Sequence, residues 1–285
     1  MVAPYNFDDH QARFSGNSAP GGDLIDDQNA KDLPHTNAPG GQTGHVDIWA
    51  RGWTAANTTY FDRAFSSGDQ YDIGGQTSCT ICGWLKVGET DGQPNYFTIH
   101  GATAAAQALM CVPRETNSGG SAGPYVGMWD GLSSFNGVEV KANSALTIAI
   151  DTWQFYAAGY DATRNKVFCY WGRAAGERHY NEATGVAAGF GYDGTGSSTS
   201  VGRWTGGGTP ARLTVDHMIW WKGRALALWE LDVMWNNHDG LPFVNFAGGT
   251  ERSSLHHRHA AAQKLIVPSS PHILTRRGRN NAAKA

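Results

Sequence analysis

The chain has 285 residues, of which 37 are glycine and 11 are tryptophan, and it carries a net charge of −3 with only 16% charged residues. This length suits one large domain with a buried core, and frequent glycines together with large aromatic side chains favour a sheet protein with many turns. The sequence contains no run of about 18 apolar residues, which excludes a membrane-spanning helix and argues against a membrane partner.

The first 50 residues are rich in glycine, proline, asparagine and aspartate, and they show almost no apolar periodicity. We therefore predict an extended N-terminal arm over residues 1–50 with one short strand. The opening letters, MVAPYNFDDHQARF, carry acids where a secretory signal peptide needs a basic end and an apolar run. We therefore expect no export through such a peptide.

Residues 51–248 are predicted to form one all-β domain. Short β-branched or aromatic runs follow one another at intervals of roughly ten residues, from NTTYFDRAF at 57–65 to ARLTVDHMIWW at 211–221. Turn-forming Gly, Asn, Asp and Ser residues separate these runs, which is typical of a sandwich or jelly roll of antiparallel sheets. The polar stretch DATRNK at 161–166 predicts a hairpin turn between two of the strands.

The periodicity changes once, after the last of these runs. Leu228, Leu231, Met234 and Trp235 recur at i, i+3, i+6 and i+7, which predicts a short helix with one apolar face. We expect Leu231, Met234 and Trp235 to face the sandwich. The sequence NNHDG at 236–240 then predicts the end of the helix.

Residues 249–285 form a basic C-terminal tail. Seven Lys or Arg residues and one acid give this tail a charge of +6, so the rest of the chain carries −9. A basic tail on an acidic body predicts docking to an acidic neighbour, such as another copy of the body. Nucleic acid is disfavoured as a partner, because the tail lacks interleaved aromatic residues for base stacking. The docking candidates are Arg252, Arg258, Lys264, Arg276, Arg277 and Arg279.

The four cysteines, Cys79, Cys82, Cys111 and Cys169, do not suggest a disulfide framework. Cys79 and Cys82 resemble half of a zinc site, but no second pair of ligands stands at a suitable spacing. Their odd separation within one strand sends the two thiols to opposite faces of the sheet. We predict small, reduced strand residues.

Three segments, taken in order, carry a family resemblance: CTICGWLKV (79–87), DTWQFYAAGYDATRNKVFCYWGRA (151–174) and VDHMIWWKGRALALWELDVMWNN (215–237). They are similar to an early core strand, the central hairpin, and the closing strand with its link and terminal helix in the laminin-G-like, concanavalin A-like family of lectins and glucanases, which also occurs in phage structural proteins. The resemblance implies a jelly-roll sandwich of two antiparallel sheets with one short C-terminal helix.

The stretch WELDVMW (229–235) differs by one residue from the E-x-D-x-x-E signature of laminarinase- and lichenase-type hydrolases, in which one strand delivers the acids to a cleft. Trp235 stands in the place of the acid/base residue, and an indole cannot protonate a leaving group. A helix would also point Glu230 and Asp232 to different sides. We therefore expect no catalytic residues and no enzyme. Glu230 instead matches the acidic half of a capping box that lacks its hydroxyl half at Ala227.

The resemblance also implies glycan binding through aromatic side chains on loops at the edge of the sandwich. Trp129 in MWDGLSS and Trp204 in GRWTGGG lie among turn residues, and we predict that these two stack on a sugar ring, while most other tryptophans fill the core. We expect no cofactor. Calcium is the alternative that the sequence leaves open, with acidic candidates Asp91, Asp130, Asp161 and Asp193.

Together these features favour a non-enzymatic structural and adhesion protein of a virion, of the capsid decoration or fibre type of a bacteriophage, that displays a lectin-like domain. Its expected partners are other copies of the chain, a major capsid or tail protein, and a cell-surface glycan. Two alternatives stay open: a free carbohydrate-binding lectin that is extracellular by another export route, and a degenerate glycan hydrolase.

Overall fold

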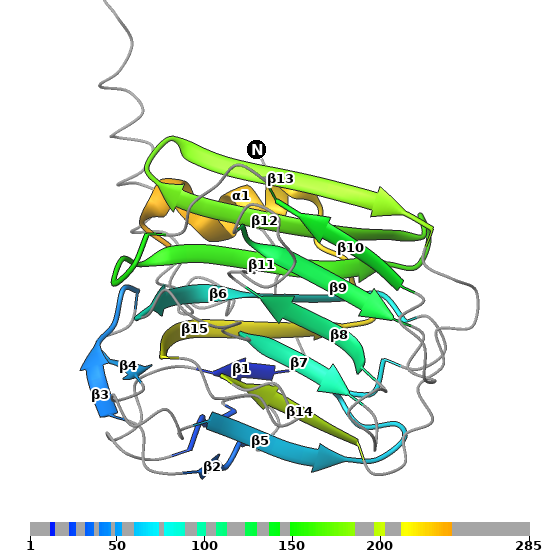
Figure 1. Ribbon diagram of the computed structural model, residues 1–285, viewed down its shortest axis with the longest axis horizontal. Coiled ribbons are helices and arrows are strands. Elements are labelled where there is room, and N and C mark those ends of the chain that lie inside the picture. Colours follow the sequence, from blue (N-terminus) through cyan, green and yellow to red (C-terminus); the bar gives the residue numbers. More distant parts are fainter. Residues whose placement is uncertain are drawn as a thin grey trace, which may run out of the picture.

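In the part of the chain that it describes, a computed structural model shows two stacked β-sheets and one short α-helix (Figure 1). The structure describes residues 12–14, 23–26, 32–36, 40–46, 49–52, 60–73, 77–88, 96–100, 107–112, 123–129, 137–142, 149–185, 197–202 and 212–240. The basic tail, 249–285, lies outside these described residues, and its docking role stays a prediction.

The larger sheet has eight strands in the order β13-β12-β11-β6-β15-β4-β3, and β1 pairs with β15 beside this path. All of these pairings are antiparallel. The strands are β1 (Ala12–Phe14), β3 (Gly40–Thr43), β4 (Trp49–Gly52), β6 (Cys79–Val87), β11 (Gln154–Asp161), β12 (Lys166–Ala174), β13 (Glu177–Thr184) and β15 (Leu213–Lys222).

The smaller sheet has seven strands in the order β10-β9-β8-β7-β14-β5-β2, also paired in antiparallel fashion. Its strands are β2 (His35–Thr36), β5 (Tyr60–Phe65), β7 (Phe97–His100), β8 (Gln107–Val112), β9 (Tyr125–Trp129), β10 (Gly137–Lys141) and β14 (Ser197–Val201).

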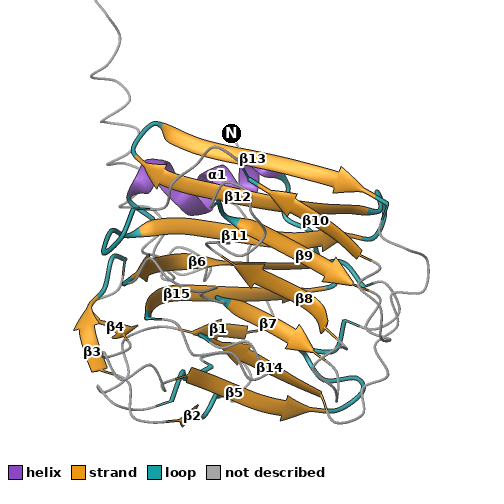
Figure 2. Cartoon of the chain, viewed as in Figure 1, coloured by secondary structure: helices purple, strands orange, loops and turns teal. Residues whose placement is uncertain are grey.

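The helix α1 (Leu228–Trp235) follows the last strand and runs into the 3-10 turn η1 (Asn236–His238) (Figure 2). Its end is set by three consecutive residues in the left-handed region, Asn236, Asn237 and His238, with φ of 48°, 52° and 84°. Asparagine tolerates this region better than most residues, so the predicted stop at NNHDG is confirmed. Within the described residues, no helix has the length and apolar character needed to span a bilayer.

The two sheets enclose a large apolar core. Side chains alternate across a strand, so every second residue of a central strand enters this core. Ile81 and Leu85 of β6, Tyr156 of β11 and Trp171 of β12 are completely buried there. The smaller sheet contributes Phe97, Ile99, Leu109, Cys111, Val126 and Met128.

The outer face of the larger sheet is also apolar, and α1 covers it. Leu231, Met234 and Trp235 are buried against this face, as predicted, and α1 lies behind β12 in Figure 1. The sheet side of this outer cluster consists of Cys82, Trp84, Phe155, Ala157, Phe168, Tyr170, Ile219 and Trp221. The central strands are therefore buried on both faces, which explains their nearly continuous apolar sequence.

The four cysteines are free and buried. Cys79 belongs to the core between the sheets and Cys82 to the outer cluster, which confirms that the two thiols occupy opposite faces. Burial raises the pKa of the Cys79 thiol to about 12. A thiol with so high a pKa is almost entirely protonated at neutral pH and reacts slowly.

The predicted all-β sandwich with a short C-terminal helix is confirmed, and so is the hairpin turn between β11 and β12. Two expectations need correction. Where the structure describes residues 12–52, four strands, β1 to β4, belong to the two sheets, instead of one short strand in an extended arm. Strand β13, with the sequence ERHYNEAT, was not predicted, because it edges the sheet and has no apolar face.

We expect Gly172→Ala to destabilise the fold by about 1–3 kcal/mol, the usual effect of adding atoms to a close-packed site. A Cβ at this position of β12 would overlap the indole of Trp235, which packs directly on the glycine. Urea denaturation measures the change, and Trp235→Leu supplies the matched background. The Gly172→Ala effect should shrink there; an equal effect in both backgrounds would show that the indole is not the cause.

Candidate functional site

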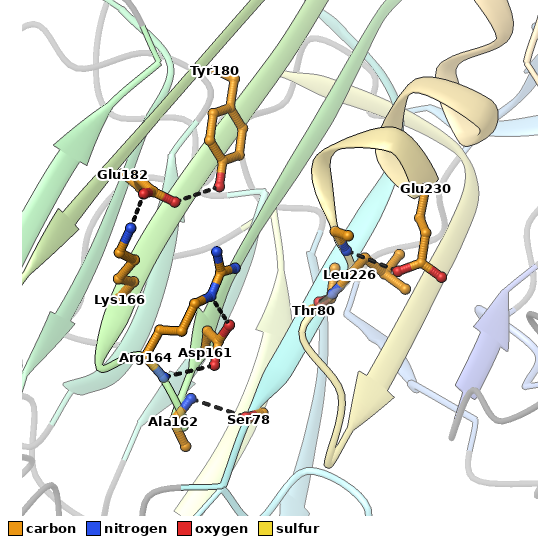
Figure 3. A network of polar contacts seen from close by, with 11 residues as sticks. Ser78, Thr80, Asp161, Ala162, Arg164, Lys166, Tyr180, Glu182, Leu226 and Glu230 are labelled. Atoms are coloured by element: carbon orange, nitrogen blue, oxygen red, sulfur yellow. Dashed lines mark hydrogen bonds and ion pairs between the residues drawn. The ribbon is translucent and has the colours of Figure 1, made fainter.

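The acid that resembles a glycosidase nucleophile stabilises the start of the helix. Glu230 Oε2 accepts a hydrogen bond of 2.8 Å from the backbone N–H of Ala227, and Oε1 forms an ion pair with Arg224. Figure 3 shows the Glu230 carboxylate turned back toward the residues that precede α1. Ala227 has no side-chain acceptor, so the predicted half of a capping box is confirmed. The missing hydroxyl costs about 1 kcal/mol of helix stability.

The link before the helix is fastened to the sheet by Thr80 of β6. Its Oγ1 donates to the carbonyl of Arg224 at 3.1 Å and accepts from the N–H of Leu226 at 3.0 Å. The second acid of the motif, Asp232, accepts a hydrogen bond from Tyr170 Oη and pairs with Arg178 Nε, each at 3.0 Å. The catalytic-strand interpretation is therefore wrong for this stretch, because it is a helix whose two carboxylates bind different partners.

The sequence-predicted ligand residues lie largely outside what the structure describes. Trp129 is the last residue of β9 and its backbone pairs with Gly137 of β10, but its side chain is not among the described ones. Trp204 and the six basic tail residues Arg252, Arg258, Lys264, Arg276, Arg277 and Arg279 also fall outside the description. All of these assignments stay predictions.

Of the four calcium candidates, the structure describes Asp161. Its carboxylate accepts hydrogen bonds from the backbone N–H of Arg164 at 3.0 Å and from Arg164 Nε at 2.5 Å, which closes the β11–β12 turn (Figure 3). Partial burial raises the pKa of Asp161, but these hydrogen bonds outweigh burial and hold it below its ordinary value. Among the described residues, no group of three or more His, Cys, Asp or Glu is placed to hold a metal ion.

A cluster of aromatic and basic side chains lies on the outer face of the larger sheet, beside η1. We call it the aromatic rim: His45, Trp84, Lys86, Trp153 and His238. Trp84 is buried at its base, and the ring centroids of His45 and His238 lie 3.9 Å and 5.1 Å from that of Trp84. Trp153 is partly exposed, and Lys86 Nζ lies 5.5 Å from its ring centroid.

The position of His45 is fixed by a buried carboxylate on β15. Asp216 Oδ2 accepts hydrogen bonds from the backbone N–H groups of His45 and Val46, both at 2.8 Å. On the other side, Gly240 packs so closely on Trp84 and Val46 that a Cβ would overlap both side chains, and its φ of 73° also favours glycine. The rim is therefore held by three separate parts of the chain.

The two histidines of the rim favour their neutral forms. His45 Nε2 lies 2.7 Å from the backbone oxygen of His238, so this nitrogen carries a proton and Nδ1 is left as an acceptor. Burial lowers the pKa of His45, against the opposing effects of that hydrogen bond and of Asp239. Burial, and then the neighbouring His45, lower the pKa of His238. Lys86 is thus the charged member of the rim at neutral pH.

Chemically, the rim offers the partly exposed flat ring of Trp153 with the Lys86 ammonium group over one side of it. An indole contributes an apolar face, Lys86 contributes donors, and a neutral imidazole can accept a hydrogen bond. Such a surface suits a flat ligand that has both C–H groups and hydroxyls. The sequence did not reveal this surface, because its five residues are far apart in the chain, at positions 45, 84, 86, 153 and 238. The local signal was limited to a tryptophan, Trp153, just before a strand.

Comparisons with known proteins identify the fold. No family model matches the sequence, and no curated protein sequence is similar to it. Domain 4 of AbnA, a GH43 extracellular arabinanase from Geobacillus stearothermophilus whose structure was solved with arabinotriose, is 14% identical with a TM-score of 0.56, over 78% of this chain and 96% of that one.

Botulinum neurotoxins form the second group of similar structures. The type C toxin, whose cell entry depends on interaction with two ganglioside molecules, is 10% identical with a TM-score of 0.54, over 80% of this chain and 51% of that one. The binding domain of the serotype D/C toxin gives the same identity and TM-score over 80% and 52%. This chain thus spans about half the length of the neurotoxin chains. At such low identities the likeness shows the fold alone, a jelly-roll-like β-sandwich.

We expect acid to destabilise the protein through its buried histidines. Burial lowers the pKa of His45, His217 and His238, so below their ordinary pKa of 6.5 the unfolded chain binds more protons than the folded one. This contribution to stability is complete above pH 6.5 and is lost as the pH falls. The melting temperature should therefore drop between pH 7 and about 5.

The variant His238→Asn, which suits the left-handed backbone at this position, should show a smaller drop. Calorimetry at constant ionic strength measures it, with His35→Asn in the other sheet as the control. An unchanged pH dependence in the His238→Asn protein would contradict the role given to this ring.

Proposed function

We propose that this protein is a non-enzymatic glycan-binding protein and that the aromatic rim is one of its binding surfaces. The observation that carries this proposal is the partly exposed indole of Trp153 with Lys86 Nζ 5.5 Å from its ring centroid. A sugar ring can place its C–H face on the indole while its hydroxyls bond to the ammonium and imidazole groups. The buried Trp84 beneath His45 keeps this surface rigid, which lowers the entropy cost of binding.

The solved structures with this fold support the ligand class. One was determined with arabinotriose, and another belongs to a toxin whose cell entry depends on gangliosides. The non-enzymatic part of the proposal is supported by the helical form of WELDVMW. A retaining hydrolase needs two carboxyl groups that converge on one bond, whereas Glu230 and Asp232 pair with Arg224 and Arg178 respectively.

The test is a glycan-array screen of the full chain, followed by titration of the best ligand. We expect Trp153→Ala to weaken binding by roughly tenfold or more, which corresponds to about 1.4 kcal/mol or more of stacking energy. Trp229→Ala is the matched control, because Trp229 is 55% exposed but stands at the opposite end of α1. Its affinity should equal that of the unmodified protein.

The two loop tryptophans provide the competing site. If Trp129→Ala or Trp204→Ala abolishes binding and Trp153→Ala does not, the glycan binds in the loops and the rim is excluded. If the folded chain binds no glycan on the array, the proposed function is wrong.

The biological setting that we propose, a virion, rests on the sequence. Its support is the basic tail at 249–285 on an acidic body, a combination that suits docking in an assembly of acidic subunits. Deletion of residues 249–285 should prevent incorporation into particles and leave glycan affinity unchanged. Immunoblots of purified particles measure incorporation. If the shortened chain is incorporated normally, the tail does not dock the protein to the particle. If the full chain is absent from particles, the proposal that the protein belongs to a virion is wrong.

A further inference from the structure

Strand β13 forms one edge of the larger sheet, and within the described residues no strand pairs with its outer side. It is eight residues long and contains no proline, and its pairing with β12 is regular from Arg178 to Thr184. Proteins usually blunt a sheet edge with proline, a bulge or a very short strand, because an edge can pair with another chain. Beyond its first residue β13 has neither proline nor a bulge. Charged side chains are a further protective device, and β13 carries them in both signs, so they can pair with each other across two copies.

The sequence of β13 complements itself. When two copies of one strand pair around a twofold axis, one residue must lie opposite its own copy. With Tyr180 in that position, Arg178 of each copy lies opposite Glu182 of the other, and His179 lies opposite Asn181. Two opposite-charge cross-strand pairs then flank a pair of tyrosines, an arrangement that favours pairing.

The neighbouring registers lack this complementarity. With Asn181 opposite its own copy, Tyr180 meets Glu182 and Arg178 meets Thr184, so no ion pair forms across the strands. With His179 in that position, Arg178 meets Tyr180. Charge therefore selects the register that is centred on Tyr180.

Three side chains of β13, those of Arg178, Tyr180 and Glu182, are held in position by contacts within their own chain. The ring of Tyr180 stacks on Phe168 with a centroid distance of 6.3 Å, and its hydroxyl donates to Glu182 Oε2 at 2.9 Å (Figure 3). Glu182 also pairs with Lys166, and Arg178 pairs with Asp232. The side chains of Arg178 and Glu182 remain 40% and 30% exposed, so each can accept a second partner of opposite charge.

We propose that a second copy of this chain pairs antiparallel along β13, with Tyr180 opposite Tyr180, and joins the two eight-stranded sheets into one continuous sheet. Each Arg178 then lies between Asp232 of its own chain and Glu182 of the other copy. Because the twofold axis is perpendicular to the sheet, both outer faces point the same way. The dimer presents two aromatic rims on one side, which would raise avidity for a surface that carries repeated ligands. The pairing itself does not depend on what the rims bind.

A cysteine scan along the strand tests the register. Cβ atoms of residues directly opposite each other lie about 4.5–5.5 Å apart, close enough for a disulfide after small adjustments. The four native cysteines are buried and do not compete. Under mild oxidation Tyr180→Cys should form a covalent dimer, visible on a non-reducing gel. Arg178→Cys and Glu182→Cys should each stay monomeric alone and crosslink when mixed, which also tests the pairing with Tyr180 intact.

Sedimentation velocity without glycan provides the second measurement. The unmodified chain should show a concentration-dependent dimer, and Glu182→Lys should weaken it at least tenfold, because two lysines would then face two arginines. Asp62→Lys is the control, since it makes the same change of charge on β5 of the smaller sheet, away from β13. The proposal is overturned if the unmodified chain stays monomeric at every concentration, or if Arg178→Cys crosslinks alone as readily as in the mixture.

Discussion

The structure depends on one constraint: the eight-stranded sheet is apolar on both faces. One face is covered by the second sheet, and the other needs a cover of its own. Helix α1 supplies it with Leu231, Met234 and Trp235, and Gly172 allows the last of these to lie directly on the backbone of β12. Hydrogen bonds fix the segments on both sides of this helix to the sheet. Thr80 binds the segment that precedes α1, and Asp216 binds the loop that carries His45.

The candidate site arises where this cover ends. The aromatic cluster under α1 is continuous with Trp84, whose ring contacts His45 and His238, and Trp153 lies at its solvent side. Trp84 thus belongs both to the apolar cluster that packs under α1 and to the proposed ligand-binding surface. The binding surface is therefore rigid, because the close packing of the outer cluster already fixes the positions of its aromatic rings.

Much of the fold could be predicted from the sequence, because local signals and tertiary packing agree. Turn residues marked the strands, the spacing of Leu231, Met234 and Trp235 marked the helix, and the separation of Cys79 and Cys82 placed them on opposite faces. The polar strand β13 gave no apolar signal, and the early strands lie among turn-forming residues. The rim could not be predicted, since it depends on strand register and on the irregular pairing between Asp216 and Ile219, which no local pattern encodes.

The order of strands has a consequence for how the protein is made. In the larger sheet, β15 (Leu213–Lys222) lies between β6 and β4, and in the smaller sheet β14 (Ser197–Val201) lies between β7 and β5. Each sheet therefore consists of two halves that a late strand joins, and the outer cover follows only with residues 228–240. During synthesis the two halves of each sheet keep exposed apolar faces and unpaired edges until β14 and β15, in the last third of the chain, have been made. Such non-local closure predicts slow folding and a nascent chain that benefits from chaperone protection until β15 is inserted.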